Sequence, residues 1–349
     1  MSQIGTTHSF DIGDGRMISL ETGKLAKQAD GAVVLRFGDT MILATIVSNK
    51  DAKEGVDFLP LTVDYQEKYA STGRFPGGFF KREAKLSDYE VLISRIVDRA
   101  LRPQFPDDYH ADTQLMLSLI SSDKENIPDA LVGLAASAAI AVSDIPFNGA
   151  ISEVRVAKID GKLVINPTRT ELANNTLEMI VAASATDIAM VEGEMCEVSE
   201  AEMLEAIKFA HEAIKIQIKG VNDFAVKAGL KPKREYCHEI NDADLKAKVM
   251  KETYDAVYAA AKKLDPNKSN RKVNFKAPLE EFKKQYTAEE LATRESLINK
   301  YYHEVEYVAV RRLAIDEKVR LDGRKTTDIR PIWAEVGYLP SPHGSAVFT

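Results

Sequence analysis

Apolar positions in the first third of the chain follow the spacing of β-strands. Residues 31–37 and 41–48 are rich in Val, Ile and Leu, and Gly38-Asp39-Thr40 joins them as a tight turn, which predicts a β-hairpin. In residues 61–66 apolar and polar side chains alternate, the pattern of a strand with one buried face. This part of the chain is therefore predicted to form a sheet.

Helical patterns and further strands follow in groups. Ser87 and Glu90 form a capping box that begins a helix, and Pro103 ends it because the residue before a proline avoids helical angles. A second capping box, Ser199 with Glu202, opens a long helix. A buried helix of small residues is predicted at 128–143, and strands at 114–121, 149–159, 163–166, 176–183 and 188–191. This grouping favours an α+β fold with mixed or antiparallel sheets.

The composition changes after residue 230. Lys231-Pro232-Lys233-Arg234 is typical of a linker. Residues 242–318 are rich in Ala, Lys, Glu and Leu, which predicts several helices, with a break near Asp265-Pro266-Asn267. Strand-like sequence resumes near Ile332. We therefore expect an α+β domain over 1–230, an all-helical domain over 231–318 and a third segment over 319–349.

An internal repeat links the two ends of the chain. A shift of 314 positions places Arg16 on Arg330, Ile18 on Ile332, Glu21 on Glu335, Gly23 on Gly337, Leu25 on Leu339, Ala32 on Ala346 and Val33 on Val347. The second copy stops at Thr349, and the equivalent point of the first copy lies inside a predicted strand. We therefore expect residues 319–349 to begin a second, related domain within which the chain is cut.

Composition narrows the class of protein. The 349 residues are 45% hydrophobic and 28% charged, which excludes a disordered or collagen-like chain. No apolar run reaches the roughly 18 residues of a membrane span, and the N-terminus lacks the pattern of a signal peptide. Cys196 and Cys237 are too few for a disulfide framework, so we expect buried or inert thiols and a cytoplasmic protein. The net charge of -7 argues against a protein coated in nucleic acid, but not against a local basic patch.

Residues 71–102 form such a basic segment, with seven Lys and Arg against four acids. It contains Phe79-Phe80-Lys81-Arg82 after two glycines. Aromatic faces stack on bases while cations hold phosphates, the combination that binds single-stranded nucleic acid without sequence preference. Alternatively, the two aromatics fill the core and the two cations are solvated.

Three arginines share one face of the predicted helix. Arg95, Arg99 and Arg102 are spaced i, i+4 and i+7, while Leu92 and Ile96 are expected to point toward a core. Guanidinium groups in a row suit phosphate or carboxylate ligands. Alternatively, neighbouring acids pair with them and the stripe is a solvated face.

The other residues with possible chemistry form no clear pattern. The six His lack metal-ligand spacing, and neither a P-loop, a dinucleotide fingerprint nor a Ser-His-Asp set is present. The acids of Glu192-Gly193-Glu194 and Glu197 suit either a cation or a surface loop. We therefore assign no catalytic residue and no metal ligand.

Several motifs along the chain point to one family. They are residues 58–68, Gly73-Arg74, residues 76–83, Ser94-Arg95, Asp98-Arg99, Arg102-Pro103, Phe147-Asn148-Gly149, Leu321-Asp322-Gly323-Arg324 and His343-Gly344-Ser345-Ala346. In these motifs, in order and over essentially its whole length, the chain resembles the bacterial polynucleotide phosphorylases.

The resemblance implies two ribonuclease PH-like domains, with mixed sheets packed against helices, joined by a small all-helical domain. It implies a homotrimer that degrades single-stranded RNA from its 3′ end, with inorganic phosphate as attacking group, Mg²⁺ as cofactor and nucleoside diphosphates as products. An RNA-degradation complex is a further partner that it suggests. RNA-binding residues implied by it are Phe79, Phe80, Lys81, Arg82, Arg95, Arg99, Arg102 and Arg324.

The first copy departs from the family at two motifs. The family's phosphate-binding Gly-Ser-Ser turn is replaced by Glu125-Asn126-Ile127-Pro128-Asp129, whose proline lacks an N–H and whose acids repel phosphate. The family's paired catalytic aspartates have no counterpart near residues 176–183. We therefore expect residues 1–230 to be a degenerate, RNA-guiding domain, the catalytic copy to lie beyond Thr349 and this chain alone to be inactive. The alternative is a non-catalytic RNA-binding and trimer-assembly module.

Overall fold

The structure, a computed structural model, describes residues 5–77, 83 and 85–349. The chain divides into two compact units, residues 1–239 and 240–349, which we call unit 1 and unit 2. Unit 1 thus reaches past residue 230, the predicted end of the first domain. Each unit is described by itself.

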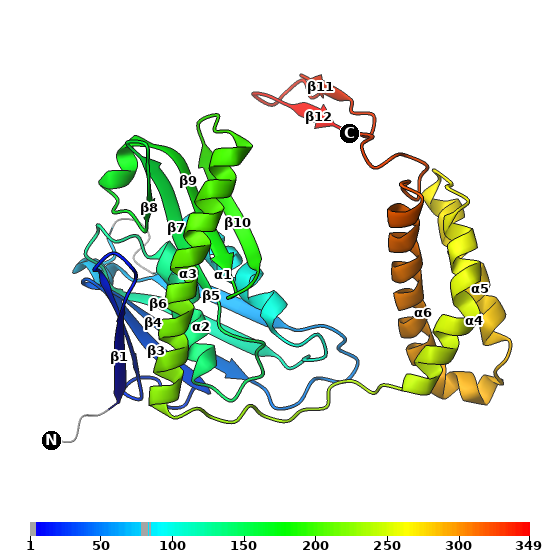
Figure 1. Ribbon diagram of the computed structural model, residues 1–349, viewed down its shortest axis with the longest axis horizontal. Coiled ribbons are helices and arrows are strands. Elements are labelled where there is room, and N and C mark those ends of the chain that lie inside the picture. The colour runs from blue at the N-terminus through cyan, green and yellow to red at the C-terminus, as the bar shows by residue number, and fades with distance from the viewer. Residues whose placement is uncertain (1–4, 78–82, 84) are drawn as a thin grey trace. The chain divides into compact units, whose positions relative to one another are not determined.

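Two sheets form the frame of unit 1 (Figure 1). The strands are β1 (Thr6–Asp11), β2 (Met17–Thr22), β3 (Gly31–Phe37), β4 (Thr40–Ser48), β5 (Leu61–Glu67), β6 (Thr113–Ser121), β7 (Ser152–Ile159), β8 (Lys162–Ile165), β9 (Asn175–Ala183) and β10 (Ile188–Met195). The first sheet has the order β1-β2-β3-β4-β6-β5, with only the β5–β6 pair parallel, and the second has the antiparallel order β10-β9-β7-β8. The predicted α+β class and the hairpin over 31–48 are confirmed. Strands β5 and β10 each form an edge.

Three helices pack on these sheets: α1 (Asp88–Leu101), α2 (Asp129–Ala141) and α3 (Glu200–Ala228). Short 3₁₀ helices lie at Tyr69–Thr72, Arg102–Gln104 and Glu171–Asn174. Both predicted capping boxes are present, at Ser87 and Ser199. Helix α2 is buried between the sheets and contacts β3, β4 and β7. A Cβ on Gly31 would lie 2.1 Å from the carbonyl oxygen of Ala139, so the small residues permit this close approach.

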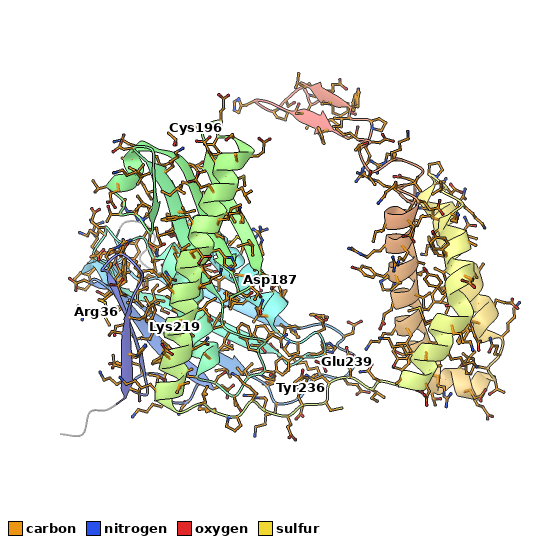
Figure 2. All side chains as sticks on the ribbon, viewed as in Figure 1. Arg36, Asp187, Cys196, Lys219, Tyr236 and Glu239 are labelled. Carbon is orange, nitrogen blue, oxygen red and sulfur yellow. The ribbon has the colours of Figure 1, made fainter. Side chains whose placement is uncertain are left out.

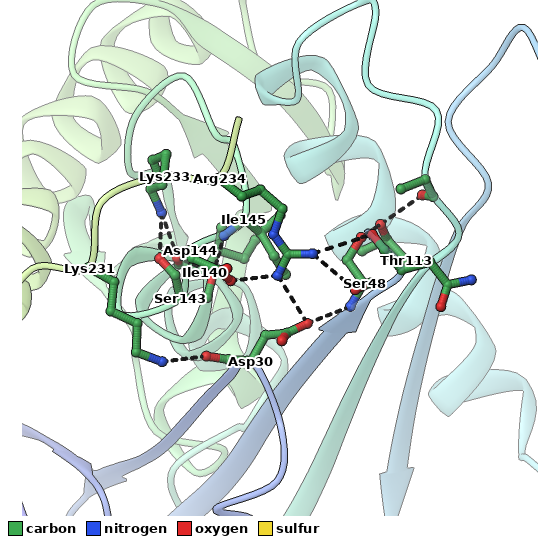
Figure 3. Close-up of polar contacts among 12 residues, drawn as sticks. Asp30, Ser48, Thr113, Ile140, Ser143, Asp144, Ile145, Lys231, Lys233 and Arg234 are labelled. Carbon is green, nitrogen blue, oxygen red and sulfur yellow. Dashed lines mark hydrogen bonds and ion pairs between the residues drawn. The ribbon is translucent and has the colours of Figure 1, made fainter. Parts of the chain in front are cut away.

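Residues 231–239, which we call the strap, are fixed along unit 1 (Figure 3). Three of its cations donate hydrogen bonds to unit 1. Lys231 Nζ donates to the carbonyl oxygen of Asp30 (2.9 Å), and Lys233 Nζ donates to the carbonyl oxygens of Ile140 (3.1 Å) and Ser143 (3.0 Å). Arg234 donates through Nη1 to the carbonyl oxygen of Ser48 (3.0 Å) and through Nη2 to Asp144 Oδ1 (2.5 Å). Lys233 thus sits at the end of α2, where the helix dipole favours a cation. Burial lowers the pKa of Lys233. The segment whose composition is typical of a linker is therefore part of the packed unit.

Unit 2 contains a helical body and a small hairpin. Its elements are α4 (Ala243–Ala261), α5 (Lys268–Lys283), α6 (Ala288–Asp316), β11 (Ala334–Val336) and β12 (Ala346–Phe348). The predicted break at Asp265-Pro266-Asn267 lies between α4 and α5. Apolar side chains of the three helices form one core, which includes Leu245, Val249, Phe282, Tyr301 and Val305.

The hairpin of unit 2 repeats part of unit 1. Under the shift of 314 positions β11 falls within β2 and β12 within β3, and both pairs are antiparallel. The apolar side chains of this hairpin region are exposed, among them Ile332 (62%), Trp333 (52%) and Val336 (82%). The structure therefore supports the repeat seen in the sequence.

Candidate nucleic-acid interface

Helix α1 lies beside the edge strands of both sheets, β5 and β10. Its inner face is apolar, because Ile93, Val97, Ala100 and Leu101 are buried in the core of unit 1. Helix α1 thereby presents its other face to solvent. The expectation that Leu92 points toward the core is wrong, since its side chain is 52% exposed and the buried stripe runs one position later.

A groove of about 550 Å³ lies between α1 and β5. Its lining residues are Leu61, Thr62, Val63, Asp64, Leu86, Val91, Ser94, Arg95, Asp98, Arg99 and Arg102. All three arginines of the predicted stripe therefore line one groove, beside an apolar wall. This combination of apolar surface and guanidinium groups suits bases and phosphates together.

The three arginines differ in their partners. Arg102 makes a two-point ion pair with Asp98 (Nη2 to Oδ1 2.6 Å, Nε to Oδ2 3.1 Å) and donates to the carbonyl oxygens of Leu59 (2.9 Å) and Leu61 (3.2 Å). Arg99 forms an ion pair with Glu192 of β10. The side chain of Arg95 is exposed and makes no hydrogen bond or ion pair with any residue that the structure describes. Arg95 is thus the most available guanidinium in the groove.

Side chains of α1 also occupy the outer edge of β5. Ser94 Oγ accepts a hydrogen bond from the backbone N–H of Tyr65 (2.9 Å), and Glu90 Oε1 accepts one from that of Glu67 (2.7 Å). With Arg102 on the carbonyl side, the helix satisfies backbone groups that an edge strand otherwise leaves open to association. The capping carboxylate of Glu90 and the Arg102 fork therefore hold the groove wall in place.

The stretch Phe79-Phe80-Lys81-Arg82 lies outside the described residues. Glu83, the described residue that follows it, is held on both its side chain and its backbone: Glu83 Oε1 accepts from the backbone N–H of Tyr69 (2.6 Å), and the carbonyl oxygen of Glu83 accepts from Gln66 Nε2 (3.0 Å). These contacts tie Glu83 to the end of β5 and to the turn that follows it.

The N-terminus of α2 holds a carboxylate of the chain itself. Asp129 forms an ion pair with Arg155 of β7, and Asp129 Oδ1 accepts from the backbone N–H of Ala130 (2.7 Å). Arg155 also pairs with Glu178 of β9. The position at which a helix N-terminus favours an anion is therefore filled by Asp129. The sequence indicated the repulsive acids of this turn, but nothing in it indicated Arg155 as their partner.

Glu153 is a second buried carboxyl at α2. It is 0% exposed, and its Oε1 accepts from the backbone N–H of Gly133, where a Cβ would clash with the carboxyl group. Its Oε2 has no partner among the described residues. Burial raises the pKa of Glu153 to about 8, so the group is protonated at neutral pH.

Arg324 lies in unit 2, whereas Arg95, Arg99 and Arg102 lie in unit 1. Its guanidinium makes a two-point contact with Asp322 (2.8 and 3.0 Å). The hydrogen bond from Arg324 lowers the pKa of Asp322 to about 2. Sequence reasoning missed Glu192 as the partner of Arg99, because these two residues are 93 positions apart in the chain.

Three further expectations concern metals, membranes and cysteines. In the part of the chain that the structure describes, no three His, Cys, Asp or Glu side chains are placed to hold a metal ion. None of the described helices combines the length and apolarity needed to cross a membrane. Cys196, in the turn between β10 and α3, and Cys237 are free and exposed rather than buried (Figure 2).

Comparison with known proteins agrees with this architecture. Residues 14–146 match domain 1 of the 3′ exoribonuclease family, and residues 149–213 match its domain 2. Along the chain, the border between the two matches lies after β6, the last strand of the first sheet, and before β7, the first strand of the second sheet. The chain therefore belongs to the 3′ exoribonuclease family.

Within that family the chain is similar to polyribonucleotide nucleotidyltransferases. Residues 244–325 match the polyribonucleotide nucleotidyltransferase RNA binding domain. Curated proteins of that name from Bacteroides fragilis, Phocaeicola vulgatus and Cytophaga hutchinsonii are 59%, 58% and 57% identical to this chain, respectively. Each match covers 98% of this chain. It covers 48% of the Bacteroides and Phocaeicola proteins and 47% of the Cytophaga protein. The chain thus spans about half the length of the curated relatives it matches.

Proposed function

We propose that this chain guides single-stranded RNA in a phosphate-dependent 3′-to-5′ exoribonuclease that releases nucleoside diphosphates. The observation that carries the proposal is the α1–β5 groove, in which exposed arginines lie beside apolar side chains. Family membership and the relatives' name support the reaction class. The match of unit 2 to an RNA binding domain supports RNA as the ligand.

In this proposal Arg95 and Arg99 hold successive phosphates of the strand. A guanidinium donates through a planar fork that fits a phosphate, and both side chains face solvent. Arg102 lines the same groove, with much of its fork already used to hold β5. We propose that Phe79 and Phe80 stack bases, that Lys81 and Arg82 hold phosphates, and that Arg324 contacts RNA from unit 2.

A second candidate, a non-catalytic RNA-binding and trimer-assembly module, is favoured by the N-terminus of α2. Asp129, paired with Arg155, occupies the place where a phosphate would need free N–H groups and positive charge. The described residues also do not fit a Mg²⁺ site, so we assign Mg²⁺ no ligand in this chain and no step. Both candidates agree that the residues of unit 1 guide RNA rather than cleave it.

The remaining parts of the proposal follow from family membership. They are inorganic phosphate as co-substrate, Mg²⁺ as cofactor, a homotrimer, association with an RNA-degradation complex, and a cytoplasmic location. We also propose residues 1–230 as the RNA-guiding ribonuclease PH-like domain and 231–318 as the all-helical domain; the strap, at the start of the second range, packs on unit 1.

RNA binding by single variants tests the groove. Arg95→Ala is expected to weaken binding of a labelled oligoadenylate about three- to tenfold and to reduce the salt slope by about 0.7, the value for one lost single-strand phosphate contact. Arg36→Ala is the matched control, because Arg36 is an exposed arginine of β3 paired with Asp39 (2.8 Å) and outside the groove (Figure 2). Equal losses in the two variants would contradict the groove as the RNA site.

Phosphorolysis tests the expectation, shared by both candidates, that the residues of unit 1 do not cleave RNA. The chain of 349 residues is incubated with homopolymer RNA, phosphate and Mg²⁺, and nucleoside diphosphates are measured. We expect RNA binding without release. Release that disappears on substitution of a residue of this chain would instead place catalysis within it.

A further inference from the structure

Glu192 of β10 forms an ion pair with Arg99 of α1. Helix α1 lies beside β5, an edge strand of the first sheet, and the ion pair joins this helix to β10, an edge strand of the second sheet. Both side chains are about half exposed, at 49% for Arg99 and 47% for Glu192. A guanidinium that lines the groove is therefore already in contact with a carboxylate of the chain.

The fold places Glu192 there through strand alternation. Met190, two positions earlier on β10, is buried in the same core as the inner face of α1. Residues i and i+2 of a strand share a face, so Glu192 emerges on the α1 side just beyond the core. Glu194 continues that face, and its exposed side chain makes no hydrogen bond or ion pair with a described residue. Glu192 and Glu194 thus differ chiefly in contact with Arg99.

We propose that Glu192 is an internal competitor of the RNA phosphate at Arg99, and so a residue that limits the affinity of the groove. The proposal rests on the proposed function. A carboxylate and a phosphate accept hydrogen bonds from the same guanidinium fork, so a phosphate can reach Arg99 fully only when Glu192 leaves it. The competition keeps the contact between Arg99 and the RNA phosphate weak and rapidly reversible. A weak contact suits a surface along which an RNA strand must slide.

The direction in which Glu192→Gln changes RNA affinity shows whether Glu192 competes with the phosphate or supports its binding. If Glu192 competes, Glu192→Gln frees Arg99 and RNA binds more tightly. If Glu192 instead holds Arg99 in the geometry that RNA needs, the same substitution weakens binding. Glutamine keeps the size of the side chain, and both residues are half exposed, so folding is preserved; the melting temperature checks this.

The experiment measures binding of a labelled oligoadenylate to the 349-residue chain across a salt series. Glu192→Gln is expected to bind about two- to fivefold more tightly, the usual worth of an exposed ion pair, with a steeper salt slope. Glu194→Gln removes the same charge from the same strand face and controls for its general effect. It should change affinity less than Glu192→Gln does.

Arg99→Ala completes the cycle. In the Arg99→Ala background the gain from Glu192→Gln should disappear. The inference is overturned if Glu192→Gln weakens binding, gains no more than Glu194→Gln, or keeps its gain without Arg99. If Arg95→Ala and Arg99→Ala both leave RNA affinity unchanged, the proposed function fails at this groove. If they weaken it while Glu192→Gln gains nothing, only the competition fails.

Discussion

Arginine meets carboxylates at two places in unit 1, the solvent-facing side of α1 and the N-terminus of α2. At α2 the side chain of Arg155 is 12% exposed and lies between Asp129 (4%) and Glu178 (19%). On α1, Arg99 is 49% exposed and has one half-exposed partner, while Arg95 has none among the described residues. The same residue type is therefore fixed within the protein at one place and available to a ligand at the other.

Burial explains the difference. A buried ion pair has lost its hydration, so each charge depends on its partner, whereas an exposed arginine exchanges water for a phosphate at little expense. The chain thus closes an anion position at α2 with its own aspartate and leaves cations open along α1. Variants at the two places should differ in what they change, stability at α2 and RNA affinity at α1.

The largest expected effect is loss of stability in Arg155→Ala. Removing the cation leaves the buried Asp129 and the partly buried Glu178 without their ion-pair partner, which costs about 3–5 kcal/mol of unfolding free energy. Denaturant unfolding followed by circular dichroism measures it. Arg95→Ala, with an exposed side chain, is the control and should unfold like the parent chain. A small effect of Arg155→Ala would show that the α2 site is as open as the groove.

A pH effect at α2 comes next in size. Glu153 has a pKa of about 8 in the folded chain and an ordinary value of 4.5. Between these values the folded state holds a proton that the unfolded state has released, so unfolding free energy falls as pH rises from about 5 to 8, by on the order of 3 kcal/mol. Thermal unfolding across this range measures the slope.

Glu153→Gln provides the control for that slope. The amide keeps an oxygen acceptor for the N–H of Gly133 but does not titrate. The variant should therefore lose most of the decline in stability between pH 5 and 8. An unchanged decline would assign the titration to other groups, and the α2 site would then lack its buried neutral acid.

Local signals in the sequence predicted much of this fold. The capping boxes at Ser87 and Ser199 fix helix starts through contacts three residues apart, and the hairpin over 31–48 follows from two apolar runs and a turn. The arginine stripe of α1 follows from helical spacing alone. The partners of these arginines could not be predicted, because Glu192 and Arg155 reach their sites only when separate strands assemble.

The strap shows why composition misleads. Lysine, proline and arginine in a row are typical of solvated linkers, yet Lys233 and Arg234 donate to carbonyl oxygens at the ends of α2 and β4. Long aliphatic stems allow such side chains to be partly buried while their charged ends reach acceptors. Only the assembled fold creates those acceptors, so no local pattern indicates the strap.

The smallest expected effect separates Arg95 of α1 from Arg102, the residue that follows α1. Arg102 uses its planar fork to hold Asp98 and the carbonyl oxygens of Leu59 and Leu61, and a lysine cannot reproduce these contacts. Arg102→Lys should therefore lower unfolding free energy by about 1 kcal/mol, discounted for its 42% exposure, and leave the RNA salt slope unchanged. Arg95→Lys keeps its charge and should change neither. Parallel thermal unfolding and RNA titration measure both variants. If Arg102→Lys leaves stability intact but reduces the salt slope, Arg102 belongs with Arg95 as an open RNA ligand, and the contrast between these two arginines disappears.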